Sequence, residues 1–487
     1  MTALIPPKKL TFWQKMFYGT GDWSLSSFTT IRALLYTIFL TDVVRLDPGL
    51  ASFSALIGTA WDAINDPLVG AINDRTRSRW GRRRPFLILF AIPFGLGFLL
   101  LWWVPPTESQ ILKMIYVTLA FMITDTLHTL VNVPYLALIP DISRDYDERT
   151  SLTGYRVLFN LLASLITAVA APTIVDEVVR SGASPQQGYI LVAALFGGLA
   201  TIPFLVIPFI IRETKTTPEK SENINIRRMW QVIARNRPFI SITAFYSLTW
   251  IAFDLVTRML PFFLVYWVGR GDSLINRSIF GQEFALESLA MGALMIVSLI
   301  SIPFWTMLST HRGKKDTYII GMIFWIVVLN ALMFVQPDQV SLTLIIAAFA
   351  GLSVATASIF PEAMLPDAVD WDEYQTGERN EGLYFGAITF FRKLSGALAA
   401  FFALQALNIF GYQPPPEGVT LFQQSAAALG AIRWMTGPFS ALLVLAAVLI
   451  AWRYPLTREQ YQQMRATLDA RTAPTPTQDD SVLPSAH

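Results

Sequence analysis

Two aspartates four residues apart are the feature of this sequence with the clearest chemistry. Asp62 and Asp66 stand in WDAINDPLVG, within an otherwise apolar stretch. On an α-helix this spacing places both carboxylates on one face, with Asn65 one position off that line. Two like charges at this distance repel, so the pair predicts a bound cation or a shared proton, and oxygen ligands suit a hard cation such as Na⁺. The alternative is that both acids form structural salt bridges.

A third acid begins the first apolar stretch. Asp22 lies beside Trp23 in YGTGDWSLSS. A carboxylate next to an indole can accept hydrogen bonds from sugar hydroxyls and stack on the apolar face of a sugar ring. The alternative is a cap at the start of a helix, so these two residues indicate either a substrate site or an interfacial cap.

The fourth apolar stretch carries a polar stripe. Asp125, Thr129, Asn132 and Leu136 recur with helical spacing, and His128 is adjacent. Lipid contact would demand apolar residues, so we expect this face to point into a helix bundle. His128 could relay a proton, but a lone histidine on a polar helix face is more often a satisfied hydrogen-bonding group.

Two basic residues stand inside apolar stretches. Arg156 could form forked hydrogen bonds to a substrate or to an acid of the first stretch. Lys393 could pair with Asp62 or Asp66 when no ion is bound. The alternative for both is that the long side chain reaches the membrane interface.

The composition places these residues in a membrane protein. Of 487 residues, 53% are hydrophobic and 15% are charged, which is too apolar for an ordinary soluble domain. Cysteine is absent, which excludes disulfides and thiolate chemistry. About 20 apolar residues span a bilayer, and twelve such stretches predict an all-α membrane protein. The spans lie roughly at 15–42, 50–72, 86–104, 111–139, 152–178, 188–211, 238–268, 284–308, 317–335, 341–364, 383–410 and 429–453.

The basic residues predict the orientation of the chain. Lys and Arg gather in the loops after the second, fourth, sixth and eighth spans, as in DRTRSRWGRRRP. By the positive-inside rule this side, with both termini, should be cytoplasmic. The start lacks the pattern of a cleavable signal peptide, and the polar tail from about residue 472 should be disordered.

The two halves of the chain repeat each other. VPYLALIPDISRDYDERT after the fourth span matches FPEAMLPDAVDWDEYQTG after the tenth, at an offset of about 226 residues. Two parallel six-helix repeats are the architecture of major-facilitator transporters. The predicted parts are an N-terminal half at 1–211, a cytoplasmic linker at 212–237, a C-terminal half at 238–455 and a partly disordered cytoplasmic tail at 456–487.

Four motifs resemble those of the glycoside-pentoside-hexuronide:cation symporters, the melibiose permease-like family of the major facilitator superfamily. They are YGTGD, WDAINDPLVG followed by RSRWGRRRPF, NVPYLALIPDIS, and DAVDWDEYQTGERNEG. The resemblance implies a cation site at Asp62, Asn65, Asp66 and Thr129, with Lys393 close to it. It implies a sugar site at Asp22, Asn132, Arg156 and Thr389.

Two positions depart from the melibiose permease pattern. Asn132 replaces a second sugar-binding aspartate, and Gly21 replaces a lysine that precedes the first aspartate. These departures leave the identity of the sugar open. The more distant lysolipid symporters share the acids of the second span and would keep the same ion chemistry with an amphipathic substrate.

The expected function is symport of a sugar or glycoside with a monovalent cation, by alternating access, with Na⁺ favoured over H⁺. We expect a monomer in the bacterial inner membrane, with no further cofactor and no nucleic-acid partner. The alternatives are a lysophospholipid or other amphiphile transporter and a non-transporting sensor. An enzyme is disfavoured, because the sequence has no GxSxG, HExxH or phosphate-loop motif and only three histidines.

Overall fold

The protein is an all-α membrane protein. The computed structural model describes residues 10–142, 146–211, 232–272, 276–279, 282–377, 381–416, 419, 421–456 and 458–472. Ten of the helices in these ranges are long and apolar enough to cross a membrane. Of the predicted linker, residues 212–231 lie outside the described residues, as does the tail after residue 472.

The first six helices form one group, called here the first bundle. Its helices are α1 (Phe12–Ile38, continued by the π-helical η1, Phe39–Val43), α2 (Pro48–Arg75), α3 (Arg84–Trp102), α4 (Gln110–Ile142), α5 (Tyr146–Arg180) and α6 (Pro185–Ile210). Local sequence signals determine where several of these helices begin. Thr11 and Ser184 form capping boxes, and Asp47 accepts a hydrogen bond from the Leu50 backbone ahead of Pro48.

The later helices form the second bundle. Its elements are α8 (Arg237–Phe262) with η2 (Phe263–Val268), α9 (Leu286–Arg312), α10 (Lys314–Ala331) with η3 (Leu332–Phe334), α11 (Val340–Thr376), α12 (Glu381–Ile409), and α13 (Ala426–Trp434) continued by η4 (Met435–Phe439) and α14 (Ser440–Trp452). A hairpin of β1 (Asn276–Ile279) and β2 (Gln282–Ala285) separates α8 from α9, with Arg277 opposite Phe284. The separate helix α15 (Arg458–Thr472) ends the described chain.

The observed helices follow the predicted spans closely, with two differences. The tenth predicted span ended near residue 364, but α11 continues to Thr376 through Pro361 and Pro366. The helices α1 and α2 are 27 and 28 residues long but are not among the ten apolar ones. Both carry charged residues, such as Asp22 and Asp62, so their membrane crossing stays a prediction.

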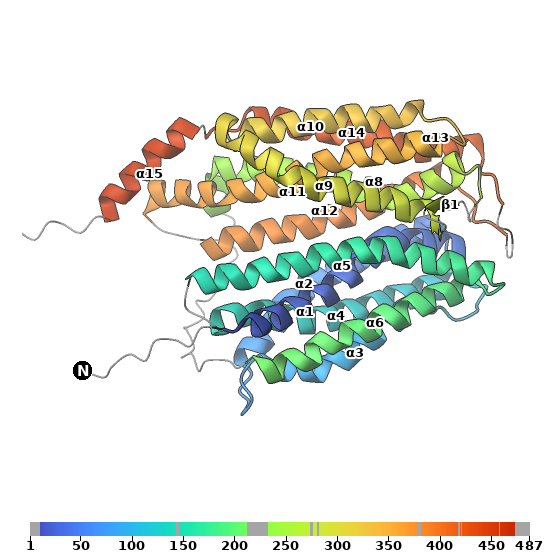
Figure 1. Cartoon of the computed structure of the whole chain (residues 1–487), viewed down its shortest axis with the longest axis horizontal. Coiled ribbons are helices and arrows are strands. Elements are labelled where there is room, and N and C mark those ends of the chain that lie inside the picture. Colours follow the sequence, from blue (N-terminus) through green and yellow to red (C-terminus); the bar gives the residue numbers. More distant parts are fainter. Residues whose placement is uncertain are drawn as a thin grey trace, which may run out of the picture.

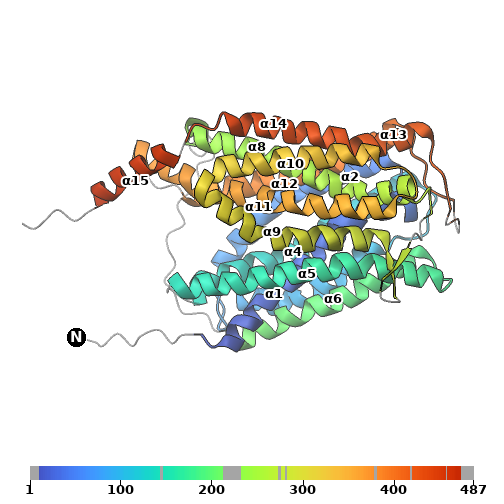
Figure 2. The same cartoon turned by 45° about the horizontal axis from the view of Figure 1, so that its top comes forward.

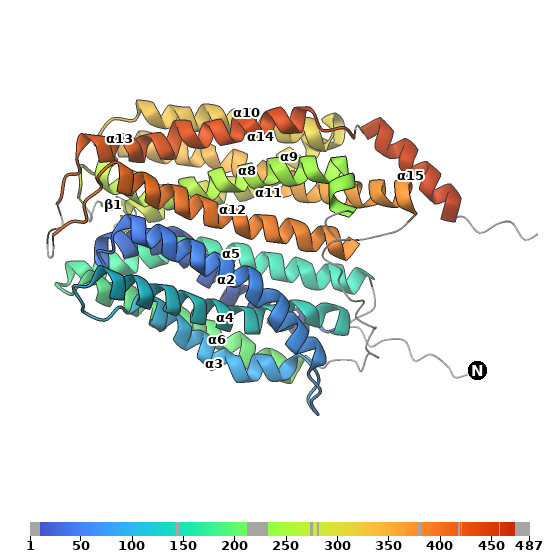
Figure 3. The same cartoon turned by 180° about the vertical axis from the view of Figure 1, so that it is seen from behind.

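The helices of both bundles run along the long axis of the molecule (Figure 1). The first bundle occupies the lower part of this view and the second bundle the upper part, and the view from behind shows the same division (Figure 3). The start of α1 and the helix α15 lie at the same end, called here the terminal end, and the β-hairpin lies at the opposite, far end.

Contacts between the bundles concentrate away from the termini. The helices α5 and α9 lie side by side (Figure 2), and the Ser288 hydroxyl donates to the Val169 carbonyl at 2.7 Å. The helices α2 and α12 are neighbours (Figure 3), and Gln405 donates to the Ser52 hydroxyl at 2.7 Å. These contacts position α12 against the two aspartates of α2.

Candidate functional site

Lys393 of α12 bridges the two aspartates of α2. Its Nζ donates to Asp62 Oδ1 at 2.8 Å and to Asp66 Oδ2. The Thr129 hydroxyl of α4 donates to Asp66 Oδ1 at 3.0 Å. Asp62, Asp66 and Thr129 belong to the first bundle and Lys393 to the second, so one ammonium group links both bundles. The pairing expected for Lys393 is present.

Asn65 does not join this cluster directly. Its side chain is buried, and its Nδ2 has no hydrogen-bond partner in the described part of the chain. The residue lies one position off the line of the two aspartates on the helix. Two carboxylates, one hydroxyl and one ammonium group therefore make up the observed cluster.

Asp22 and Arg156 form a second cluster, entirely inside the first bundle. Arg156 donates from Nε to Asp22 Oδ2 and from Nη2 to Asp22 Oδ1, the latter at 3.3 Å. The Tyr135 hydroxyl also donates to Asp22 Oδ2, at 2.9 Å, and the Tyr18 hydroxyl donates to the Tyr135 carbonyl at 2.8 Å. A forked guanidinium–carboxylate pair of this kind is geometrically specific. It excludes the simple role of a helix cap for Asp22, which lies inside α1.

Tyr135 also explains why a glycine precedes Asp22. A Cβ atom on Gly21 would lie 2.4 Å from Tyr135 Cε2, well inside the contact distance of two carbons. The ring of Tyr135 therefore fills the space that a side chain at position 21 would need. The departure from the melibiose permease pattern is thus built into the packing of α1 against α4.

The other predicted substrate residues stand apart from this pair. Trp23 and Asn132 are half-buried, and neither side chain forms a hydrogen bond with another described residue. Thr389 is exposed on α12, and its hydroxyl donates to the Phe385 carbonyl one turn earlier, at 2.9 Å. The structure brings Asp22 and Arg156 together, but it does not join them to Thr389.

Two further ion pairs lie inside the spans and were not predicted from the sequence. Arg32 of α1 donates to Asp125 of α4 at 3.2 Å, and Arg392 of α12 donates to Asp254 of α8 at 2.7 Å. The Arg392 guanidinium also stacks 3.7 Å from the centre of the Trp250 ring. The available signal was the presence of opposite charges in different spans, but sequence spacing does not show which helices are neighbours.

His128 has an aromatic environment rather than a polar one. Its ring stacks on Phe28 with centroids 5.1 Å apart and lies 5.9 Å from the ring of Phe94. No hydrogen bond joins it to the residues that the structure describes. These contacts give no support to a proton relay.

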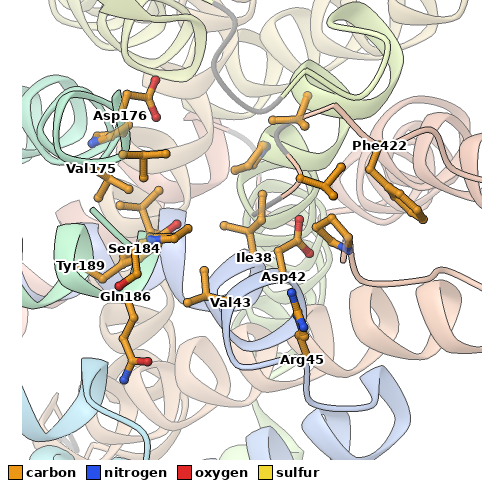
Figure 4. Close-up of a pocket in the computed structure, with 18 of the residues that line it drawn as sticks. Ile38, Asp42, Val43, Arg45, Val175, Asp176, Ser184, Gln186, Tyr189 and Phe422 are labelled. Atoms are coloured by element: carbon orange, nitrogen blue, oxygen red, sulfur yellow. The ribbon is translucent and has the colours of Figure 1, made fainter. Parts of the chain in front are cut away.

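The far end contains a cavity of about 640 Å³ between the bundles (Figure 4). Asp42 of η1 and Asp176 of α5 lie on two of its sides (Figure 4). Asp42 accepts hydrogen bonds from the hydroxyls of Tyr266 and Tyr412 in the second bundle, and the two hydroxyl oxygens lie 2.9 Å apart. Burial and the charge of Asp42 raise the pKa of the Tyr412 hydroxyl, so it remains a donor.

None of the predicted cation- or substrate-site residues lines this far-end cavity. Within the described ranges, no three His, Asp or Glu side chains are grouped so that they could hold a metal ion.

Several curated proteins are similar to the chain over nearly its whole length. An uncharacterized symporter of Synechocystis sp. is 29% identical, covering 97% of this chain and 99% of its own. The sodium-dependent lysophosphatidylcholine symporter 1 of Gallus gallus is 27% identical, covering 95% and 90%. An uncharacterized symporter of Bacillus subtilis is 28% identical, covering 95% and 96%.

Solved structures show the same fold at low sequence identity. A bacterial homolog of the human lysosomal transporter Spinster, in an inward-facing and unoccupied conformation, superposes with a TM-score of 0.61 at 12% identity, covering 95% of this chain and 98% of its own. A structure from work on proton-dependent oligopeptide transporters gives 0.63 at 13% identity, covering 93% and 99%. Residues 17–458 match the family of MFS/sugar transport proteins. The chain therefore belongs to the MFS/sugar transport protein family, with the major facilitator fold.

Proposed function

We propose that this secondary transporter couples the symport of a sugar or glycoside to a monovalent cation, with Na⁺ favoured over H⁺. The observation that carries the proposal is the bridge from Lys393 to Asp62 and Asp66. One ammonium group faces two carboxylates there, which leaves one negative charge for a bound cation. Asp62 and Asp66 would be the charged ligands, with Thr129 and Asn65 as neutral oxygen ligands.

Competition between Lys393 and the cation supplies a means of coupling. A cation at Asp62 and Asp66 weakens their attraction for Lys393, because it neutralises the same carboxylates. The second bundle is then less tightly tied to the first at this point. Rocking of the two bundles about a central substrate is the usual motion of this fold.

The substrate site we propose lies beside Asp22 and Arg156. Their charges compensate each other, so the pair can accept and donate hydrogen bonds without a large desolvation cost for a neutral sugar. Trp23 and Asn132 would add a stacking surface and an amide from the first bundle. Thr389 would contribute from α12, one turn before Lys393, so that substrate and cation act on the same helix.

We also propose the orientation, the membrane and the oligomeric state of the transporter. The start of α1 and the helix α15 lie at one end of the molecule (Figure 1), and by the positive-inside rule we propose that this end faces the cytoplasm. We place the chain in a bacterial inner membrane as a monomer. No cofactor is needed beyond the transported cation.

An amphiphile is the second candidate cargo, and two observations favour it. The relative from Gallus gallus is described as a sodium-dependent lysophosphatidylcholine symporter. On the terminal side of the contact between Val169 and Ser288, α5 and α9 expose apolar side chains at Leu158 and Phe304. An apolar lining between these helices would suit an acyl chain, whereas a sugar needs only the polar site beside Asp22.

Uptake into proteoliposomes separates these candidates. We would measure uptake of a glycoside panel and of lysophosphatidylcholine, with and without a Na⁺ gradient, at two pH values. Na⁺-dependent glycoside uptake supports the proposal, and Na⁺-dependent uptake of lysophosphatidylcholine alone supports the second candidate. Absence of cation-dependent uptake for every compound would favour a non-transporting sensor.

Cation binding tests the ion site independently of the cargo. The purified variants Asp62→Cys and Asp66→Cys should each lose Na⁺ affinity by roughly tenfold or more, because a charged ligand is removed. The variant Asp338→Asn, at an exposed ion pair with Arg270, is the matched control. Unchanged Na⁺ affinity in both cysteine variants would show that the site is elsewhere.

A further inference from the structure

The far-end cavity is a formed pocket with fixed walls. Its volume of about 640 Å³ lies within the usual range for pockets that bind small molecules, about 300–1,000 Å³. On one wall, the Gly271 N–H donates to the Val265 carbonyl at 2.8 Å, and the Phe422 N–H donates to the Gly271 carbonyl at 2.9 Å. On another wall, the ring of Tyr189 stacks on Trp102 with centroids 5.2 Å apart. The pocket therefore has a defined shape.

Much of the lining is apolar and comes from both bundles. The side chains of this kind include Leu35, Ile38, Val43, Val175, Val265 and Phe422. Small-molecule pockets usually combine such a lining with a few polar groups that orient the ligand. The lining of the far-end cavity therefore suits a ligand with an apolar body.

The charged side chains of the lining are mostly acidic. Three acids and one base line the cavity in the described part of the chain: Asp42, Asp176, Glu287 and Arg45. Figure 4 shows Asp42 and Asp176 on different sides of it. Arg180 and Asp272 also act on Asp176, but their opposite charges cancel each other. When the acids are ionised, the lining therefore carries two negative charges in excess.

Glu287 is the acid that lacks a partner from the protein. The residue is 8% exposed, and it forms no hydrogen bond or ion pair with another residue that the structure describes. The next residue, Ser288, lies 3.0 Å from Thr173 of α5 between their hydroxyl oxygens, which holds this end of α9 against the first bundle. The buried hydroxyl of Tyr189, which also lines the cavity, likewise has no hydrogen-bond partner among the described residues. A buried carboxylate is costly unless it is paired or protonated, so Glu287 favours a cationic ligand.

The size and lining of the cavity favour an organic cation over a metal ion. The described residues include no group of three His, Asp or Glu side chains that could hold a metal ion. An ammonium group can donate several hydrogen bonds to carboxylates, and aromatic rings such as those of Tyr189 and Tyr266 attract it further. Its carbon body would contact the apolar lining.

We propose that the far-end cavity binds an organic ammonium compound with an apolar body, with Glu287 and Asp176 as counter-charges from the two bundles. Because both bundles supply walls, the complete site exists only while they approach each other at the far end. The ligand therefore favours conformations in which this end is closed. The proposed cation and sugar sites contribute no residue to the lining, so the ligand is an effector and the inference does not depend on the proposed function.

Three probes that share one ring and differ in charge test the site. They are phenethylammonium chloride, 2-phenylethanol and sodium phenylacetate, titrated calorimetrically into the purified protein in detergent at neutral pH and equal Na⁺ and ionic strength. The ammonium compound should bind about tenfold or more tightly than the alcohol, as expected for hydrogen bonds to charged groups, and the carboxylate more weakly than the alcohol.

Protection of a cysteine locates the bound probe. The ammonium compound should slow the labelling of Val175→Cys by a neutral thiol reagent, because Val175 lines the cavity. Labelling of Phe334→Cys should stay unchanged, because Phe334 is 77% exposed and lies outside the lining.

The variant Glu287→Gln nearly preserves the shape of the side chain but removes its charge. It should lose most of the preference for the ammonium compound over the alcohol. Asp176→Asn, on the other bundle, should weaken the same preference and is an independent test if Glu287→Gln folds poorly. Asp338→Asn, at the exposed ion pair with Arg270, is the matched control and should keep the full preference.

Three results would overturn the site. The first is that the ammonium compound binds no more tightly than the alcohol, and the second is that Glu287→Gln and Asp176→Asn both keep the preference. The third is that Asp62→Cys abolishes ammonium binding, because the probe would then occupy the central cation site. Absence of cation-coupled uptake would refute the proposed function but leave this site intact.

Discussion

Two carboxylate-centred contacts join the bundles, and they differ in the chemistry of the partner. In the middle of the molecule, Lys393 offers a full positive charge to Asp62 and Asp66. At the far end, Tyr266 and Tyr412 offer neutral hydroxyls to Asp42. A free cation can replace an ammonium group, but it does not replace a phenol that stays protonated.

The difference suggests that the two contacts have separate functions. The contact at Lys393 responds to the ion and so suits a coupling element. The contact at Asp42 depends only on how closely the two bundles approach, so it is suited to holding the far end closed. Both contacts must open when the bundles move apart, but only the first should open more easily in the presence of Na⁺.

The largest expected effect follows loss of the ammonium group. In Lys393→Met, two carboxylates remain close together without a counter-charge, and the protein without Na⁺ should lose about 3 kcal/mol of stability, the lower end of the cost of breaking a buried ion pair. Added Na⁺ should restore much of the loss. The measurement is thermal unfolding in choline chloride and in sodium chloride.

Lys15→Met serves as the control for this experiment. Lys15 makes a long ion pair with Glu148, at 3.9 Å, outside the contact between the bundles. Its loss should cost less than about 1 kcal/mol and show no dependence on Na⁺. An equal response of both variants to Na⁺ would contradict competition at Asp62 and Asp66.

A smaller effect is expected at the far end. Asp42→Ala removes the acceptor of two phenol hydroxyls, and loss of a hydrogen bond to a charged group costs about 1.5–3 kcal/mol. The equilibrium should shift by roughly tenfold or more toward conformations with the far end open. Because the chain has no cysteine, labelling of a single Val175→Cys in the far-end cavity reports this shift directly.

The shift in labelling should be independent of Na⁺, in contrast to the effect of Lys393→Met. Asp338→Ala, at an exposed ion pair, is the matched control and should leave the rate of labelling unchanged. If Val175→Cys is labelled equally slowly in the presence of Asp42 and in the Asp42→Ala background, this contact does not hold the far end closed.

The smallest effect concerns a neutral ligand of the cation site. Thr129→Val removes the hydroxyl that donates to Asp66 but preserves the shape of the side chain. The loss of one such interaction is worth about 1 kcal/mol, so Na⁺ affinity should fall about fivefold. Na⁺ titration of the purified variant measures it. An affinity loss as large as that of Asp66→Cys would mean that Thr129 does more than donate one hydrogen bond.

Much of the site was predictable because charge in a membrane is costly wherever it occurs. Asp62 and Asp66 stand out in an apolar stretch, and Lys393 is conspicuous for the same reason. The pairing of Arg392 with Asp254 was not predictable, because 138 residues separate the two in the sequence. The same holds for Tyr135, which looks like an ordinary aromatic residue of a span until it meets Asp22 and Gly21.

The sequence by itself determined the membrane-embedded helices, their approximate ends and the acids that demand partners. These depend on local hydropathy and on the cost of burying a charge, which are properties of each segment alone. The tertiary structure decided the partners: Lys393 for Asp62, Arg156 for Asp22, and Arg392 for Asp254. The choice depends on how helices from the two bundles pack and rotate against each other, and helical spacing in one segment carries no information about that.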